Sequence, residues 1–109
     1  MLFRSTAIGT SSKANGANAF AGGVGANASG TNAFAGGVGA SAANTDALAL
    51  GQGSNAANTS ATAIGNASVA QGSSATAIGT SSKANGANAF AGGVGASAAN
   101  TDEIGRAHV

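Results

Sequence analysis

The chain has 109 residues, of which 19 are glycine and 6% are charged, and it contains no Pro, Cys, Trp or Tyr. The absence of cysteine excludes a disulfide framework and cysteine-ligated metal sites, and a formal net charge of +1 argues against a nucleic-acid-binding surface. Alanine supplies most of the 43% apolar content but buries little area. The chain is therefore either low-complexity disorder or a repeat whose narrow interior takes small residues. No apolar run is long enough to span a bilayer, so we expect no membrane insertion of this segment.

The two ends of the chain depart from everything between them. The codons GAG-ATC-GGA-AGA-GCA-CAC-GTC encode the final EIGRAHV. The reverse complement of their AGATCGGAAGAGCAC portion, GTG-CTC-TTC-CGA-TCT, reads MLFRS when GTG is the start codon. Both ends resemble a translated DNA-sequencing adapter, so we expect residues 1–4 and 103–109 to be non-native. Excluding them removes the single histidine, His108, and with it any histidine chemistry.

Between these ends runs a strict repeat of 14 residues. Phe20 and Phe34 are one period apart, and Phe90 lies four periods further on. The repeat divides without insertion into seven blocks, which begin at Ser5, Ala19, Ala33, Ala47, Ala61, Ala75 and Ala89. Because a fixed period is typical of stacked repeat architectures, we expect each block to be one coil of a single domain covering residues 5–102. Residues are described below by their position, first to fourteenth, within a coil.

Two positions of each coil predict turns. The fifth position is always glycine: Gly9, Gly23, Gly37, Gly51, Gly65, Gly79 and Gly93. The twelfth position is glycine or asparagine: Gly16, Gly30, Asn44, Asn58, Gly72, Gly86 and Asn100. Both residue types tolerate a positive φ, so we expect a corner at each position. The first to fourth and the eighth to eleventh positions then leave room only for short strands.

The alternation within those strands predicts which side chains point inward. The first, third, eighth and tenth positions are alanine or serine, as in Ala61, Ala63, Ser68 and Ala70. Alternate side chains of a strand share one face, so these small residues describe a flat, narrow coil. The ninth and eleventh positions are mostly polar, as in Lys13, and we expect them to face water.

The second and fourth positions carry the largest apolar side chains, on the face that points away from the alanine interior. Wherever phenylalanine occupies the second position, glycine occupies the fourth, which indicates that volume is conserved in a tight space. An uncovered apolar ribbon would be an aggregation hazard, so we expect further copies of the chain to cover it about a symmetry axis. The residues expected at this axis are Phe20, Phe34, Leu48, Leu50, Ile64, Ile78 and Phe90. The sequence predicts an all-β, oligomeric parallel β-solenoid.

The coil pattern A-T-A-I-G-x-x-S-x-A-x-G resembles the head repeats of trimeric autotransporter adhesins, the YadA-like or Hep/Hag family. SATAIGNAS at Ser60–Ser68 and SATAIGTSS at Ser74–Ser82 are similar to the N-S-V-A-I-G-x-x-S motif of that family, and DALALGQGS at Asp46–Ser54 is a third variant. The phenylalanine coils, such as NAFAGGVGA at Asn18–Ala26, keep the alanine and glycine positions but replace the motif isoleucine by glycine. The resemblance covers essentially all of residues 5–102.

The resemblance implies a left-handed parallel β-roll of three intertwined chains, a homotrimer displayed at the outer-membrane surface of a Gram-negative bacterium. It implies adhesion to host cells or matrix proteins such as collagen, autoagglutination and a role in virulence. In some members the motif is linked to collagen binding, which points here to Ile64, Gly65, Ser68, Ile78, Gly79 and Ser82. The same residues suit purely structural roles in the turns, the core and the axis. We expect any export signal, stalk and membrane anchor to lie outside these residues.

Other functional classes fit the residues less well. The stretch AGGVGA at Ala21–Ala26 lacks the Lys-Ser/Thr pair of a phosphate-binding loop, and no nucleophile–base set remains in the repeat. We therefore expect neither an enzyme nor a metal or cofactor site. A structural or recognition solenoid, such as a phage tail fibre or an ice-binding rod, is the alternative to an adhesin. Thr6, Thr62 and Thr76 share the second position, but Phe and Leu interrupt the threonine ladder that ice binding needs.

Overall fold

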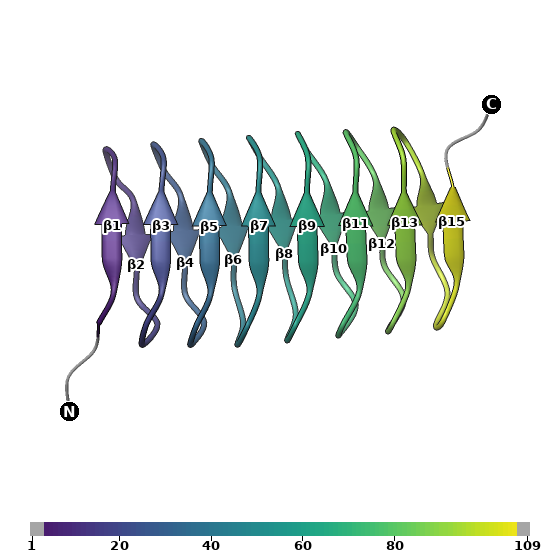
Figure 1. The fold of residues 1–109 in the computed structure, drawn as a ribbon, viewed down its shortest axis with the longest axis horizontal. Helices are drawn as coiled ribbons and strands as arrows, with labels where there is room; N and C mark the ends of the chain where they lie inside the picture. Colours follow the sequence, from purple (N-terminus) through teal and green to yellow (C-terminus); the bar gives the residue numbers. More distant parts are fainter. Residues whose placement is uncertain (1–3, 107–109) are drawn as a thin grey trace.

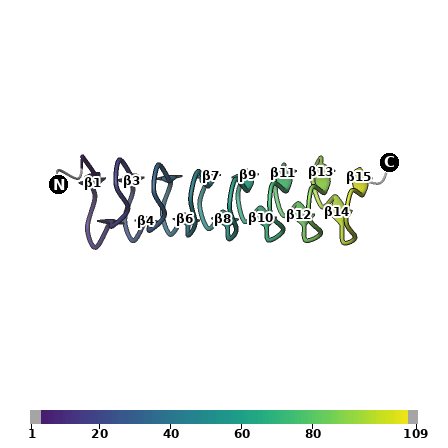
Figure 2. The ribbon, with the colours of Figure 1, turned by 90° about the horizontal axis from the view of Figure 1, so that it is seen from below.

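A computed structural model describes residues 4–106 of the chain. These residues form 15 short β-strands joined by turns, and no helix occurs in this range. The strands stack into a flat rod with principal extents of 45 × 24 × 11 Å (Figure 1). Figure 2 shows the rod turned by 90°, with the odd-numbered and even-numbered strands in two layers. No stretch of the described chain forms a helix that could cross a membrane. Residues 1–3 and 107–109 of the adapter-like ends, including His108, lie outside the described residues.

The two layers are two parallel sheets, which we call sheet A and sheet B. Sheet A contains the eight longer strands: β1 (Thr6–Ile8), β3 (Phe20–Gly22), β5 (Phe34–Gly36), β7 (Leu48–Leu50), β9 (Thr62–Ile64), β11 (Thr76–Ile78), β13 (Phe90–Gly92) and β15 (Ile104–Arg106). Sheet B contains the seven shorter strands: β2 (Lys13–Ala14), β4 (Asn27–Ala28), β6 (Ser41–Ala42), β8 (Asn55–Ala56), β10 (Val69–Ala70), β12 (Lys83–Ala84) and β14 (Ser97–Ala98). Each coil thus contributes one strand to each sheet.

Every strand pairs in parallel with the equivalent strand of the next coil, so that Phe20 lies beside Thr6 on one side and Phe34 on the other. The 14-residue coil with two short strands is therefore confirmed. The strands are shorter than expected because the first, eighth and eleventh positions lie outside them, the first two in the corners. The amide of Ala19 donates to the carbonyl of Gly16 at 3.2 Å, and the amide of Ser12 donates to Gly9 at the same distance.

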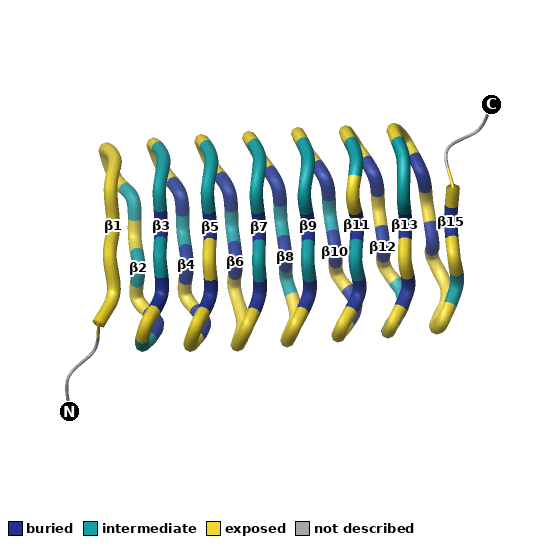
Figure 3. The backbone as a smooth tube through the Cα atoms, in the orientation of Figure 1, coloured by how far each residue is buried: buried dark blue, intermediate teal, exposed yellow. Residues whose placement is uncertain are grey.

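The interior of the rod is built almost entirely from alanine. The buried hydrophobic residues are all alanines at the first, third, eighth and tenth positions, with exposed fractions of 2% or less. Ser54, Ser68 and Ser82 replace alanine at the eighth position and are equally buried. Figure 3 shows this buried material repeating at the same place in successive coils, so the predicted small-residue interior is confirmed.

The predicted positive φ is confirmed for the glycines at the fifth position but is wrong for those at the twelfth. The fifth-position glycines have φ between 109° and 128°, as in Gly65 with 128°. At the twelfth position, by contrast, Gly16, Gly30, Gly72 and Gly86 do not have a positive φ. At these glycines a Cβ would overlap the next coil, as one on Gly16 would overlap the carbonyl group of Gly30, whereas the coils of Asn44, Asn58 and Asn100 accommodate a side chain at this position. The twelfth glycine therefore permits close approach between coils rather than an unusual backbone conformation.

The left-handed backbone lies instead at the seventh and fourteenth positions. The non-glycine residues there have φ between 57° and 61°. At the fourteenth position they are Asn18, Asn32, Asp46, Ser60, Ser74, Asn88 and Asp102. Asparagine and aspartate accept this conformation because their short polar side chains bond locally. The sequence analysis expected the corners only at the fifth and twelfth positions and missed these two.

The ladder continues into the adapter-like end. Ile104, Gly105 and Arg106 of β15 pair with Phe90, Ala91 and Gly92 of β13. The carboxylate of Glu103 accepts hydrogen bonds from Nδ2 of Asn100 at 2.8 Å and from the amide of Ala99 at 2.9 Å. These bonds lower the pKa of the Glu103 carboxyl, with the Asn100 side chain as the largest cause. Backbone pairing therefore extends the solenoid beyond Asp102, although the side chains of Ile104–Arg106 do not follow the pattern of the repeat.

Candidate binding surface

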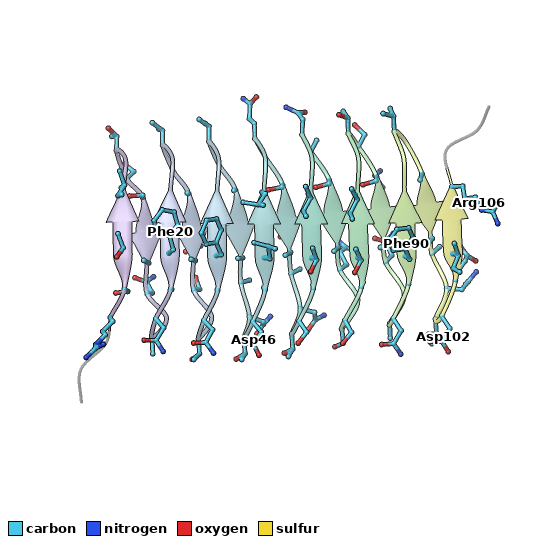
Figure 4. All side chains as sticks on the ribbon, in the orientation of Figure 1. Phe20, Asp46, Phe90, Asp102 and Arg106 are labelled. Carbon is cyan, nitrogen blue, oxygen red and sulfur yellow. The ribbon has the colours of Figure 1, made fainter. Side chains whose placement is uncertain are left out.

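The outward face of sheet A carries the residues expected at a trimer axis. Phe34, Phe90 and Ile78 are 37%, 41% and 41% exposed, whereas Phe20, Leu48, Leu50 and Ile64 are half-buried. Their strands pair in register, so these side chains form two adjacent rows along the rod. Figure 4 shows Phe20 and Phe90 on β3 and β13 of this sheet. We call these rows the apolar face; the sequence analysis expected these residues on an outward face, and their place at a trimer axis stays a prediction.

Each phenylalanine of the apolar face lies close to a glycine of its own strand. A Cβ on Gly22 would stand 2.8 Å from Cε1 of Phe20, and one on Gly92 would stand 2.7 Å from Cε1 of Phe90. The Phe20 and Phe34 rings also stack, with centroids 4.7 Å apart and planes 16° from parallel. The predicted exchange of volume between the second and fourth positions therefore takes place within a single coil.

The phenylalanine coils also carry an exposed valine just beyond the glycine corner. Val24, Val38 and Val94 occupy the sixth position and are 51–70% exposed. In the other coils this position is polar: Thr10, Gln52, Asn66 and Thr80. Apolar surface thus extends around one edge of the rod only where the fourth position is glycine. The sequence analysis did not identify this edge, although the repeat alignment contains the signal.

The six residues of the possible matrix-binding motif occupy three different environments. Ile64 and Ile78 are register partners on the apolar face. Gly65 and Gly79 form fifth-position corners, with φ of 128° and 127°. Ser68 and Ser82 are buried, and their hydroxyls donate to the carbonyls of Gly65 and Gly79 at 3.0 and 2.8 Å. Of the four side chains that these six residues carry, only those of the two isoleucines lie on an outward face.

The opposite edge of the rod holds a polar ladder that the sequence analysis also missed. Nδ2 of Asn18 donates to Oδ1 of Asn32 at 3.2 Å, and Nδ2 of Asn32 donates to Oδ1 of Asp46 at 3.1 Å. Asn88 and Asp102 repeat the arrangement at 3.2 Å. Figure 4 shows Asp46 and Asp102 at this edge. The signal in the sequence is the 14-residue spacing of asparagine and aspartate at the fourteenth position.

Comparison with known protein families shows which family this coil sequence belongs to. The family model described as YadA head domain repeat (2 copies) matches residues 3–26, 42–68 and 70–96, which is more than half of the chain. The chain belongs to the YadA head family. The predicted resemblance is confirmed. No curated protein matches the chain.

The part of this YadA head that the structure describes, residues 4–106, contains no pocket. Within residues 4–106, no group of three or more His, Asp or Glu side chains could hold a metal ion. YadA heads in general are not enzymes. In this YadA head the candidate binding surfaces are the apolar face of sheet A, the outward polar face of sheet B and the two edges of the rod.

Proposed function

We propose that the chain forms part of the surface-exposed head of a homotrimeric bacterial adhesin, with its apolar face turned toward the trimer axis. The observation that carries this proposal is the row of outward apolar side chains on a chain of the YadA head family. Phe34, Phe90 and Ile78 have no covering element within the described residues. Contiguous apolar surface of this kind marks an interaction site, and a symmetric assembly would bury it in every copy at once.

The proposed trimer leaves the outward face of sheet B for external partners. The ninth position of each coil lies on this face and is mostly polar, as in Lys13, Asn27, Ser41, Asn55 and Lys83. Val69 is the one large apolar residue at this position. The side chains repeat at the spacing of parallel strands, about 4.8 Å. Three copies of such a surface would raise the strength of binding to a repetitive ligand through multivalency.

We propose host matrix proteins such as collagen, host-cell surfaces and other heads of the same kind as the partners. A fibrous ligand suits an elongated, shallow surface, because it can contact many coils at once. Ile64, Gly65 and Ser68 and their equivalents Ile78, Gly79 and Ser82 would then support binding by maintaining the head. Ser68 and Ser82 are fully buried, so a direct contact to ligand through their hydroxyls would require the coil to open.

The test uses the full 109-residue chain. Its mass would be measured by light scattering, and its binding to immobilised collagen, to host cells and to itself would be measured by surface plasmon resonance or sedimentation. We expect a trimer that binds at least one of these partners and dissociates more slowly than a non-assembling variant. A trimer that binds none of them would contradict the adhesin function. Inhibition of ice recrystallisation by such a non-binding trimer would support the alternative of an ice-binding rod.

A further inference from the structure

Two exposed asparagines precede glycine at the corner between sheet B and the twelfth position. They are Asn15, followed by Gly16, and Asn85, followed by Gly86. Neither side chain makes a hydrogen bond within the described residues. The amides of Asn44 and Asn58, by contrast, donate to the carbonyls of Ala57 and Gln71 at 2.6 and 2.8 Å. The side chains of Asn15 and Asn85 are therefore exposed and not restrained by a hydrogen bond within the described chain.

The backbone amides that follow these asparagines are weakly held. The amide of Asn15 donates to the carbonyl of Ala28 at 2.9 Å, and the amide of Gly16 shares that acceptor at 3.4 Å. The amide of Asn85 donates to Ala98 at 2.8 Å, whereas the amide of Gly86 donates to no backbone carbonyl in the described chain. Amides of the fifth-position corners differ, since that of Gly79 donates to Ile64 at 2.8 Å.

We propose that Asn15 and Asn85 are sites of spontaneous deamidation in the folded head. The deprotonated amide nitrogen of the following glycine attacks the side-chain carbonyl carbon, and ammonia leaves after taking up a proton. This forms a five-membered succinimide. Water then adds to either carbonyl carbon of the ring and breaks its bond to the ring nitrogen, giving aspartate or isoaspartate. The net change is consumption of one water and release of one ammonia at each site.

The fold retains the residue that makes the reaction fast. Glycine at the next position leaves the attacking nitrogen sterically free, because it carries no side chain. A Cβ on Gly16 would overlap the carbonyl of Gly30, and one on Gly86 would overlap that of Asn100. Alanine cannot replace either glycine without displacing the neighbouring coil. The close approach of neighbouring coils at Gly16 and Gly86 thus maintains the reactive Asn-Gly pairs.

Deamidation would change both the charge and the backbone of this corner. An aspartate at Asn15 places a carboxylate two residues after Lys13, on the outward side of sheet B. An isoaspartate instead inserts a methylene into the backbone beside buried Gly16, where the coils already make close contact. Both sites lie away from the apolar face, so assembly through that face would leave them accessible.

The chain contains matched internal controls. Ser29–Gly30 and Gln71–Gly72 occupy the same two positions in other coils, and neither should react at a comparable rate. Serine has no side-chain amide, and attack on glutamine requires a less favourable six-membered ring. Asn55 tests the role of glycine, because its neighbour is Ala56. Replacing Asn85 by Gln reproduces the Gln71–Gly72 pair, so the variant should fold as the parent does.

The experiment incubates the folded full-length chain in mildly alkaline and mildly acidic buffers and follows tryptic peptides by mass spectrometry. Cleavage after Lys13 and Lys83 releases peptides that begin at Ala14 and Ala84. We expect the mass gain of amide-to-acid conversion at Asn15 and Asn85, faster in alkali and several-fold faster than at Asn55. Asn85→Gln should abolish it at that site alone. The proposal would be overturned if the folded chain kept both asparagines while the same chain in urea lost them, or if Asn55 reacted equally fast.

Discussion

The ring of Phe20 lies over Gly22, leaving no room for a side chain there: an added Cβ would stand 2.8 Å from Cε1 of the ring. The motif coils reverse this distribution, with Thr62 at the second position and Ile64 at the fourth. Both solutions place similar apolar volume on one coil without altering the alanine interior behind it. The apolar face is therefore determined by pairs of positions rather than by single residues.

This pairing predicts strong coupling between substitutions at Phe20 and Gly22. Gly22→Ile alone forces the Phe20 ring outward, and such overpacking costs about 1–3 kcal/mol of unfolding free energy. Phe20→Thr alone removes buried ring area and is also destabilising. The double substitution recreates the Thr62/Ile64 arrangement, and a double-mutant cycle from urea unfolding should show a favourable coupling of about 0.5–3 kcal/mol. Additive single effects would show that the two positions do not share the same space.

The corners predict a stabilising substitution at Ala67. Ala67 occupies the seventh position with φ of 59°, whereas Gly25, Gly39, Gly53 and Gly95 occupy it in other coils. Left-handed backbone costs alanine roughly 1–2 kcal/mol, and glycine loses part of that gain through its larger unfolded-state entropy. Ala67→Gly should therefore raise the free energy of unfolding by about 1 kcal/mol in urea titrations.

The matched control for this prediction is two residues earlier. Gly65 has φ of 128°, and an added Cβ would stand 2.7 Å from the carbonyl carbon of Gly79. Gly65→Ala should lower stability by about 3 kcal/mol, because backbone strain and steric overlap coincide. If both substitutions moved the urea midpoint in the same direction, φ would not be what distinguishes these corners.

Much of this architecture could be predicted from the sequence because the repeat samples each position seven times. A single coil would not separate inward Ala63 from outward Thr62, but seven aligned coils do. The role of Gly16 could not be read in this way, because glycine is selected both for positive φ and for close approach. Positive φ at Ser60 and Ala67 also went unpredicted, since serine and alanine do not themselves favour it; the signal lay in residues such as Asn18 and Gly25 at the equivalent positions of other coils. Nor does the sequence show that Glu103 and Ile104 continue the ladder, because backbone pairing does not depend on the repeat.

Ser68 allows the structural and binding roles of the motif to be separated. Its hydroxyl is buried and donates to Gly65, while Ala26 and Ala40 occupy the equivalent position without such a bond. Ser68→Ala should preserve the fold and lower stability by about 1 kcal/mol, the net value of one hydrogen bond. Binding of the folded variant to collagen-coated surfaces should equal that of the parent. Loss of binding at unchanged stability and assembly would show that the hydroxyl contacts ligand directly.

A charge on the apolar face should block assembly, whereas the same charge on sheet B should not. Phe34→Asp places a carboxylate where we propose that three copies meet, and burying it unpaired would cost several kcal/mol per chain. Ser41→Asp introduces the same charge in the same coil, on the outward side of sheet B. Sedimentation velocity should show smaller species for Phe34→Asp and parent-like species for Ser41→Asp. Equal effects of the two variants would mean that charge alone, rather than its location, controls assembly.

The most direct measurement is the mass of the unaltered chain in solution, by light scattering across a range of concentrations. Each chain has a mass of 9.9 kDa, and burial of the apolar face about an axis predicts a particle of three chains. Dissociation on dilution should yield that particle and its subunits, without larger species of undefined size. A folded chain that remained monomeric at every concentration, with Phe34 and Ile78 still exposed, would contradict the assignment of this face to a trimer axis.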